Sequence, residues 1–466
     1  MLVLGGFLSL LTIYILQARG QRDLSYWHSY DLPDELDGDD SDDFDRYLAR
    51  EEKIFAELAE LIEDEKDATA GAPFNRFTPN SLSNPAGRAK NWNRTFIIEQ
   101  ADPAGAALLI HGLSDSPYSM RAVSETFERE GYDVIGLRVP GHGTVPGALR
   151  EARAEDWKHA VNLATRHLAE RLDDGETLVL VGYSNGAALA VNQALTAVED
   201  GESRIPDQLI LISPALRVSS LAALARVQLG LAQIPGLSKL AWTDVLLEFD
   251  PYKYNSFAVQ AGRQIWRLTR NLYPRTDALT PEQRASFPPV LAFVSAVDAT
   301  VPASAITEYL PRLGRNGSEV VVFGVNRVIK NAELLHGHST AFLAPLLEAP
   351  SLSYDLTMIT NLSDDSYDVI ERTKKAGSPD WNDRALHMAW PRRVFSLSHV
   401  ALPFRVDDPL YGVLPDLSAV RPLPSLGALD LKGERGVVDI PPDLMMRLRH
   451  NPFFEYMDAR IAGVLD

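Results

Sequence analysis

The feature that most constrains this fold is the sequence Gly-Tyr-Ser-Asn-Gly at residues 182–186. It lies between an apolar run, residues 177–181, and a helix-forming run, residues 187–191. A buried strand, a sharp turn carrying a serine and then a helix form the layout of a nucleophile elbow. The two glycines are expected because strand and helix crowd together there, and a Cβ would clash. Although G-x-S-x-G alone arises by chance, its flanks predict that Ser184 is held with an exposed hydroxyl.

Strand and helix patterns alternate on both sides of this turn. Helical patterns separate the short apolar runs, which implies a mostly parallel sheet covered by helices on both faces. The expected strands are residues 106–110, 132–137, 177–183, 208–212 and 290–294, and the main helices are residues 119–130, 155–172 and 187–198.

Two longer stretches interrupt this alternation. Residues 215–288 hold no strong strand pattern but include an apolar helical run, which we interpret as a helical lid over the carboxyl end of the sheet. Ordinary helical packing fits the same pattern. A second, irregular stretch at about residues 326–391 is predicted to be an insertion.

Composition limits the classes of partner and cofactor. The net charge of −18 and the absence of a basic stripe with interleaved aromatics argue against nucleic-acid binding. With no cysteine, the 466 residues cannot supply a disulfide, a thiolate metal site or a cysteine nucleophile. His336 and His338 are spaced i, i+2 without an H-E-x-x-H pattern, which is a weak metal site. We expect no cofactor and no metal.

The chain begins with 17 residues that carry no charge. We predict a transmembrane anchor at residues 1–18, and hence a membrane location. A cleaved signal peptide is the alternative, but no base precedes the apolar run and residues 17–20 make a poor cleavage site. Arg19 and Arg22 weakly favour a cytoplasmic side for the rest of the chain.

An acidic linker is predicted after the anchor, at residues 19–45. Residues 31–45 contain nine acids and no base, which is typical of a solvated spacer. Residues 46–466 form the predicted folded domain. It opens on an amphipathic helix, because apolar residues recur at three- and four-residue spacing through residues 44–62.

A serine hydroxyl is a weak nucleophile without a base, a group that orients the base and donors for the developing oxyanion. Asp298 directly follows the strand at residues 290–294, so its carboxylate is expected at the sheet's carboxyl edge, where ligands gather in such folds. A helix-capping role is the alternative for Asp298. The strand at residues 106–110 runs into His-Gly-Leu, which places the backbone N–H of Leu113 near that of Asn185 as the oxyanion donors.

Two histidines are candidates for the base. His399 follows a short run, residues 393–398, that reads as a strand, and a base needs a rigid position just beyond a strand end. His338 follows Asp298 by 40 residues, close to an ordinary helix-plus-strand interval, but comes after a polar, helix-like stretch. We therefore favour His399 and keep His338 as the alternative.

Together these motifs resemble the α/β-hydrolase superfamily, in its serine esterase, monoacylglycerol-lipase-like and S33 serine-aminopeptidase-like branch. The matching pieces are residues 109–113, 138–144, 182–186, 297–298 and 398–400. The resemblance implies a Ser184–His399–Asp298 triad with Leu113 and Asn185 as oxyanion donors. The interval of about a hundred residues between Asp298 and His399 departs from the family pattern.

The expected function is hydrolysis of a small, partly apolar carboxylic ester through an acyl-enzyme on Ser184. A catalytically inactive membrane-anchored binding scaffold is one alternative. A peptidase or C–C hydrolase with the same triad is another, because fold and triad do not fix the substrate.

Overall fold

The computed structural model describes residues 20–30, 43–69, 72, 74–201, 203–218, 225–329, 340–413, 424–428 and 445–465. The predicted anchor at residues 1–18 and the acidic residues 31–42 lie outside these ranges, and so does His338. Of the helices in the described ranges, none combines the length and the apolar composition that crossing a membrane requires.

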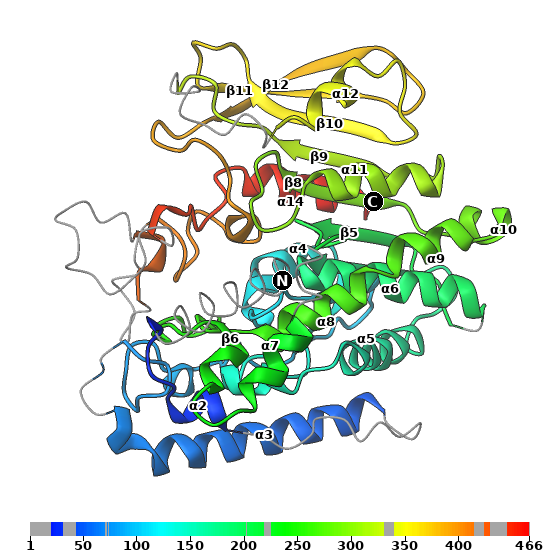
Figure 1. Ribbon diagram of the computed structural model, residues 1–466. Helices are drawn as coiled ribbons and strands as arrows, with labels where there is room; N and C mark the ends of the chain where they lie inside the picture. Colours follow the sequence, from blue (N-terminus) through cyan, green and yellow to red (C-terminus); the bar gives the residue numbers. More distant parts are fainter. Residues whose placement is uncertain are drawn as a thin grey trace, which may run out of the picture.

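The described residues form a ten-stranded sheet with the order β1-β3-β2-β4-β5-β8-β9-β10-β11-β12 (Figure 1). Neighbouring strands from β3 through β10 are parallel. β1 at one edge and the β11–β12 hairpin at the other are antiparallel. The strands are β1 (Phe96–Ile98), β2 (Gly105–Ile110), β3 (Tyr132–Leu137), β4 (Thr177–Tyr183), β5 (Gln208–Ile212), β8 (Val290–Ser295), β9 (Glu319–Phe323), β10 (Asp355–Asn361), β11 (Asp368–Lys374) and β12 (Trp381–Ala389).

Helices cover both faces of the sheet, which explains why its central strands are apolar on both sides. Every residue of β2, β3 and β8 is buried. One core contains side chains of α5 (Ala154–Ala169) and α6 (Asn185–Asp200). The opposite core contains side chains of α4 (Arg121–Arg129) and α14 (Phe454–Ala462). The predicted architecture, a mostly parallel sheet with helices on both faces, is confirmed.

The described part of the segment at residues 215–288 contains short helices together with the β6–β7 pair. Its helices α8 and α9 pack against α6 and contribute buried Leu268 and Leu272 to the same core. In Figure 1 they run along the α5 and α6 side of the molecule. The elements are α7 (Ala225–Ala232), β6 (Trp242–Asp244), β7 (Phe257–Ala258), α8 (Val259–Thr269), α9 (Leu272–Ala278) and α10 (Pro281–Ala285).

The stretch at residues 326–391 is not irregular, so that expectation is wrong. Besides α12 (Leu343–Glu348), it contributes β10, β11 and β12, which extend the sheet beyond β9. β10 carries a mostly buried run and pairs in parallel with β9, while β11 and β12 form a hairpin at the exposed end of the sheet. This extension accounts for most of the interval between Asp298 and His399.

Part of the predicted linker lies on the folded body. Residues 20–30 include α2 (Tyr26–Ser29), where the His28 ring bonds the Ser256 hydroxyl at 3.0 Å and the Trp27 ring stacks on Phe77. The amphipathic helix α3 (Phe44–Asp64) follows. Its buried Glu51 pairs with Arg138 at 2.9 Å, so α3 is tied to the segment after β3.

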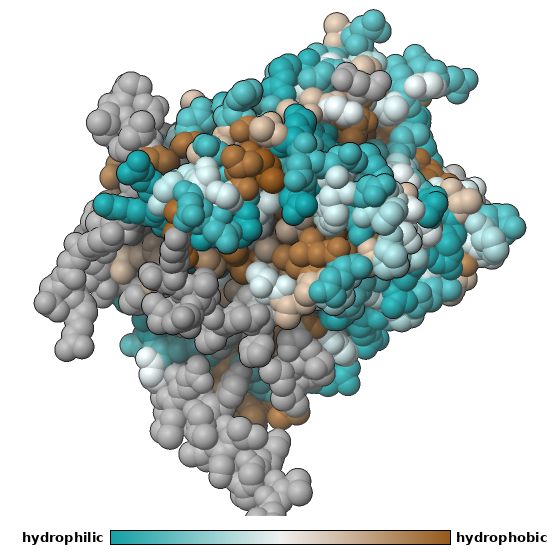
Figure 2. Space-filling model, turned by 90° about the horizontal axis from the view of Figure 1, so that it is seen from above, coloured by the Kyte–Doolittle hydropathy of each residue, from teal (hydrophilic) through white to brown (hydrophobic). Residues whose placement is uncertain are grey.

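The face of the molecule in Figure 2 is hydrophilic over most of its coloured area, with separate apolar patches between the polar side chains. Singly exposed apolar residues such as Val227 and Ile234 are ordinary on a protein surface.

Candidate active site

Ser184 occupies a strained turn between β4 and α6. Its φ of 54° and ψ of −112° lie in a region that residues with a side chain rarely adopt. The backbone around it is fixed, since the Ser184 N–H donates to Ile212 O at 2.9 Å and the Ser184 carbonyl accepts from Ala215 N at 3.1 Å. These contacts hold the serine at the carboxyl edge of the central strand, as the elbow pattern predicts.

The two glycines of the pattern sit where the backbone is most crowded. A Cβ on Gly186 would lie 2.0 Å from the Ile110 carbonyl oxygen at the end of β2. A Cβ on Gly182 would lie 2.4 Å from Ala187 Cα at the start of α6. Both distances are far shorter than any side-chain contact allows, so α6 can start this close to β2 and β4 only with glycine at these positions.

The loop that follows β2 lies beside this turn. Asn185 is the first residue of α6, a position whose N–H has no partner inside a helix and is available to an anion. Leu113 follows Gly112, where a Cβ would lie 2.7 Å from Asp115 Oδ2 and 3.1 Å from the Tyr183 ring. The Gly112 contacts place the loop directly against β4, next to the serine.

His399 and Asp298 form a buried pair. The His399 Nδ1 atom lies 2.7 Å from Asp298 Oδ2, and the exposed fractions of the two side chains are 5% and 1%. The His399 ring also packs against the Tyr183 ring, with 5.4 Å between centroids. The structure thus brings together His399 and Asp298, two predicted members of the triad. The pair lies against Tyr183, the residue before Ser184.

The Asp298 carboxylate is held in its charged form. Burial alone would raise its pKa, but His399 and the N–H groups of Val301 and Thr300 outweigh burial, so the pKa lies below its ordinary value. The two N–H groups donate to Oδ1 at 3.0 Å and 2.8 Å, which leaves Oδ2 for the imidazole. Asp298 is therefore suited to orient a histidine base.

His399 reaches Asp298 although the extension separates them in sequence. The Ser295 hydroxyl at the end of β8 donates to Leu397 O at 2.8 Å, and the Asn326 N–H donates to Phe395 O at 2.8 Å. Residues 395–397 are thus fixed along the ends of β8 and β9. The predicted strand at residues 393–398 is wrong: only an isolated bridge joins Ser396 to Val325, and His399 begins a short 3₁₀ turn.

Two further contacts brace the loop after β2, and sequence reasoning missed them. Lys253 Nζ lies 2.6 Å from Asp115 Oδ1, and the Tyr254 N–H donates to Ser114 O at 2.8 Å. Lys253 and Tyr254 belong to the segment between β5 and β8, about 140 residues from Asp115. No spacing pattern signals a contact between such distant loops.

His111 and His142 are buried and hydrogen-bond to the loops that surround the site. The Val139 N–H donates to His111 Nε2 at 3.0 Å, so Nδ1 carries the proton and donates to Gly112 O at 2.8 Å. Burial and the neighbouring His142 hold the pKa of His111 well below its ordinary value. Burial also lowers the pKa of His142, to about 4. Both rings are therefore neutral near pH 7 and serve the loops around the site.

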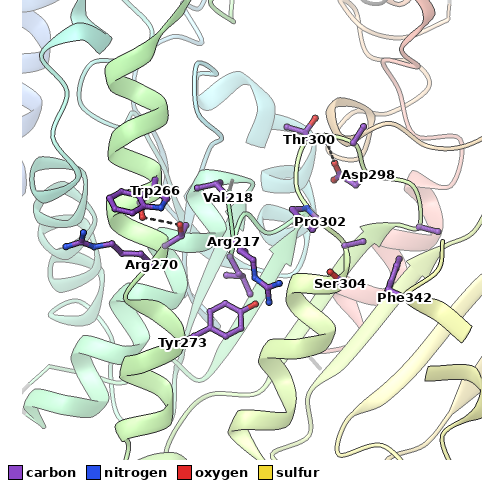
Figure 3. A pocket seen from close by; sticks show the side chains of 15 residues that line it. Arg217, Val218, Trp266, Arg270, Tyr273, Asp298, Thr300, Pro302, Ser304 and Phe342 are labelled. Atoms are coloured by element: carbon purple, nitrogen blue, oxygen red, sulfur yellow. Dashed lines mark hydrogen bonds between the residues drawn. The ribbon is translucent and has the colours of Figure 1, made fainter. Parts of the chain in front are cut away.

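A cavity of about 870 Å³ has Asp298 in its lining, but neither His399 nor Ser184 (Figure 3). Its walls come from residues 216–218 after β5, from α8 and α9, and from the loop after β8 that carries Asp298. Trp266, Val218 and Phe342 give it apolar surface, while Arg217 and Tyr273 lie together on one side. The Arg217 charge is balanced by an ion pair with Glu308. Within the described residues, no cluster of three or more acidic or histidine side chains is arranged to hold a metal.

Comparison with known proteins shows that this core is similar to one family. Residues 101–324 match the family described as serine aminopeptidase, S33. This segment carries the elbow, the loop after β2 and Asp298. This match covers a little under half of the chain, and it supports the predicted α/β-hydrolase fold and the predicted S33 serine-aminopeptidase-like branch.

Individual relatives align with parts of the chain. A thermostable monoacylglycerol lipase of Bacillus sp. (strain H-257) is 33% identical over 89 residues, which is 19% of this chain and 34% of that lipase. The chain thus spans about a third of that relative's length. A solved metagenome-derived lipolytic enzyme is 24% identical over 51% of this chain and 89% of its own, with a TM-score of 0.38. The monoacylglycerol lipase of Paleococcus ferrophilus is 21% identical over 50% and 89%, with a TM-score of 0.37.

Proposed function

We propose that the protein hydrolyses carboxylic esters through an acyl-enzyme on Ser184. In the proposed reaction His399 takes the Ser184 proton while the hydroxyl oxygen attacks the acyl carbon. The alcohol leaves with that proton. A water then attacks the acyl-enzyme with His399 again as the base, which releases the carboxylic acid and restores the serine.

One observation carries this proposal: the buried His399–Asp298 pair lies beside the strained turn that carries Ser184. A carboxylate on Nδ1 fixes the tautomer that leaves Nε2 free to accept a proton, and it stabilises the imidazolium that forms. The N–H groups of Leu113 and Asn185 are proposed to stabilise the oxyanion, the usual function of a backbone pair at a helix start.

The size and the walls of the cavity beside Asp298 favour an uncharged, partly apolar substrate. Its size falls within the range of small-molecule pockets, and its apolar walls suit an aliphatic or aromatic group. The segment between β5 and β8 forms one side of this cavity. We propose that this segment is the lid under which the substrate binds.

The decisive experiment is the Ser184→Ala variant assayed with short p-nitrophenyl esters. We expect hydrolysis to fall by several orders of magnitude with unchanged circular dichroism, because the nucleophile alone is lost. A fluorophosphonate probe should label the unmodified protein at Ser184 and not the variant. Undiminished turnover in Ser184→Ala would exclude the proposal, and no labelling of the unmodified protein would favour the binding scaffold.

The base is tested by replacing each candidate histidine separately. His399→Ala is expected to cost several orders of magnitude in kcat, whereas His338→Ala should leave kcat within a few-fold of the unmodified protein. The opposite outcome would transfer the role to His338. Assaying amino-acid p-nitroanilides beside the esters distinguishes a peptidase, whose anilide turnover would exceed that of the esters.

We also propose membrane attachment through residues 1–18, on the strength of their uncharged, apolar sequence. The full chain should stay with membranes after alkaline carbonate extraction, while a chain starting at Gly20 should be released. Recovery of the full chain in the soluble fraction would contradict this attachment.

A further inference from the structure

A second cavity, of about 480 Å³, lies between α3 and residues 76–95, and it combines two kinds of wall. One wall is apolar and comes from Phe55, Leu58 and Ile62 of α3 and from Phe77. The other wall is cationic, with Arg76, Arg88, Lys90 and Arg94. This concentration of positive charge stands out in a chain of net charge −18.

Arg76 is the central cation of this cavity. Its exposed fraction is 2%, and its Nη2 donates to Gly143 O at 3.1 Å. The buried Nη1 atom has no hydrogen-bond partner among the described residues. A buried guanidinium with an unused donor is costly unless an anion completes its hydrogen bonds.

Direct ion pairs with described carboxylates are formed by only part of this wall, although the buried Glu248 acts electrostatically on Arg76. Arg94 pairs with Glu52 at 2.5 Å, but neither Arg76 nor Lys90 forms an ion pair with a described carboxylate. Lys90 instead lies over the Trp92 ring, 3.8 Å from its centroid. Burial lowers the pKa of Lys90, only partly offset by Glu128. An anionic head would complete the hydrogen bonds of Arg76 and would give Lys90 a direct ionic partner.

We infer that this cavity binds a single-chain anionic amphiphile with a carboxylate or phosphate head. The head sits among Arg76, Arg88 and Lys90, where guanidinium groups recognise such oxyanions by paired hydrogen bonds. The aliphatic chain lies along the α3 wall, where Leu58 is buried and Ile62 half-buried. The volume lies within the range of small-molecule sites. This binding does not depend on the proposed ester hydrolysis.

Calorimetric titration of the full chain tests the site, with decanoate and decyl phosphate as probes. Acetate, inorganic phosphate and decanol are the matched partial probes, each lacking either the chain or the charge. Both amphiphiles should bind at least tenfold more tightly than any partial probe. Equal affinity for decanol would exclude the cationic wall, and equal affinity for inorganic phosphate would assign the cavity to free phosphate; either result overturns the inference.

Variants separate this cavity from the active site, which could itself hold decanoate as a product. Lys90→Met should weaken decanoate binding by roughly ten- to hundredfold, because one charge-assisted contact is lost. Lys53→Met, an exposed α3 cation that does not line the cavity, should leave binding unchanged. Ile62→Ser should weaken decanoate with no change in acetate binding. Wild-type affinity in both Lys90→Met and Ile62→Ser would overturn the inference, whatever the outcome of the Ser184 experiments.

Discussion

Gly186 stands where α6 approaches the end of β2 most closely. Its missing Cβ leaves room for the Ile110 carbonyl, which would otherwise be 2.0 Å away. Neither backbone can retreat, because β2 is fully buried between β3 and β4. The turn at Ser184 therefore depends on a residue that takes no part in the chemistry.

Replacing Gly186 by alanine is expected to destabilise the fold by about 3 kcal/mol or more, through overpacking against fixed backbone. Gly230→Ala in α7 is the matched control, since a Cβ there meets no atom within 4 Å and alanine favours helix. Urea unfolding measures both variants. A Gly186→Ala protein as stable as the control would show that α6 can shift away from β2.

Asp298 permits a test with a pH dependence. Asp298→Asn keeps the shape but reverses the hydrogen bond to His399, so the proposed esterase activity should fall by about 10⁴-fold. The carboxylate pKa is lower in the folded protein than its ordinary value of 3.8, so its stabilising contribution is complete above pH 3.8 and is lost as pH falls further. The stability gap between the unmodified protein and Asp298→Asn should therefore narrow as the pH falls below about 3.8 in urea unfolding. A constant gap would contradict this assignment.

The residues readable from the sequence are those whose signal is local. Ser184 lies in a pentapeptide bounded by strand and helix, and Asp298 comes three residues after the end of β8, so each position is set by its own neighbours. Asp115 and Lys253 form their pair across two loops, and neither carries a local signal. Such contacts depend on how loops meet at the sheet edge, which no single stretch encodes.

At the scale of elements, the loop after β2 is braced by the segment between β5 and β8. The bond from Tyr254 N–H to Ser114 O and the Lys253–Asp115 ion pair hold the two residues that follow the proposed oxyanion donor Leu113. Lys253 is in this sense a positioning residue. Its removal should affect the transition state more than substrate binding.

Lys253→Met is expected to lower kcat by about tenfold with KM nearly unchanged, equivalent to ~1.4 kcal/mol of transition-state stabilisation. Lys253→Arg should restore most of the rate because it keeps the charge beside Asp115. Lys239→Met, which removes an exposed pair with Asp23, serves as the control. Steady-state kinetics measure all three, and a change confined to KM would assign Lys253 to substrate binding instead.

The sheet extension shows why the outer elements were harder to predict than the centre. The central strands β2, β4, β5 and β8 carry continuous apolar runs because both of their faces are covered. β12 is largely exposed, with Asp383, Arg384 and His387 along one short stretch, so hydropathy does not mark it as a strand. Its strand conformation comes from pairing with β11, and no local sequence pattern predicts that pairing.

At the scale of the whole molecule, the stability of the fold depends on pH through buried neutral histidines, one of which is His28 in the N-terminal segment. The Ser25 N–H donates to His28 Nδ1 at 2.9 Å, and burial lowers the pKa of His28 to about 4. The unfolded chain takes up a proton below about pH 6.5, which the folded protein does not. Stability is therefore expected to fall as pH drops from 6.5 to 4.

His28→Gln should reduce that fall by about 2–3 kcal/mol, since one of the buried rings no longer titrates. Chemical unfolding at pH 7 and pH 4 gives the comparison. His387→Gln, at an exposed position on β12, is the matched control and should retain the full fall. Identical pH profiles for the two variants would show that His28 is accessible in the folded state.

The long stretch of sequence between Ser184 and His399 also has a consequence for biosynthesis. Ser184 leaves the ribosome 215 residues before His399, with β8 to β12 made in between. At 5–20 residues per second, the elbow exists for roughly 10–40 s before its proposed base has been synthesised. A ribosome-bound chain in that interval would hold the central strands but no general base, so the proposed activity would begin only near the end of translation.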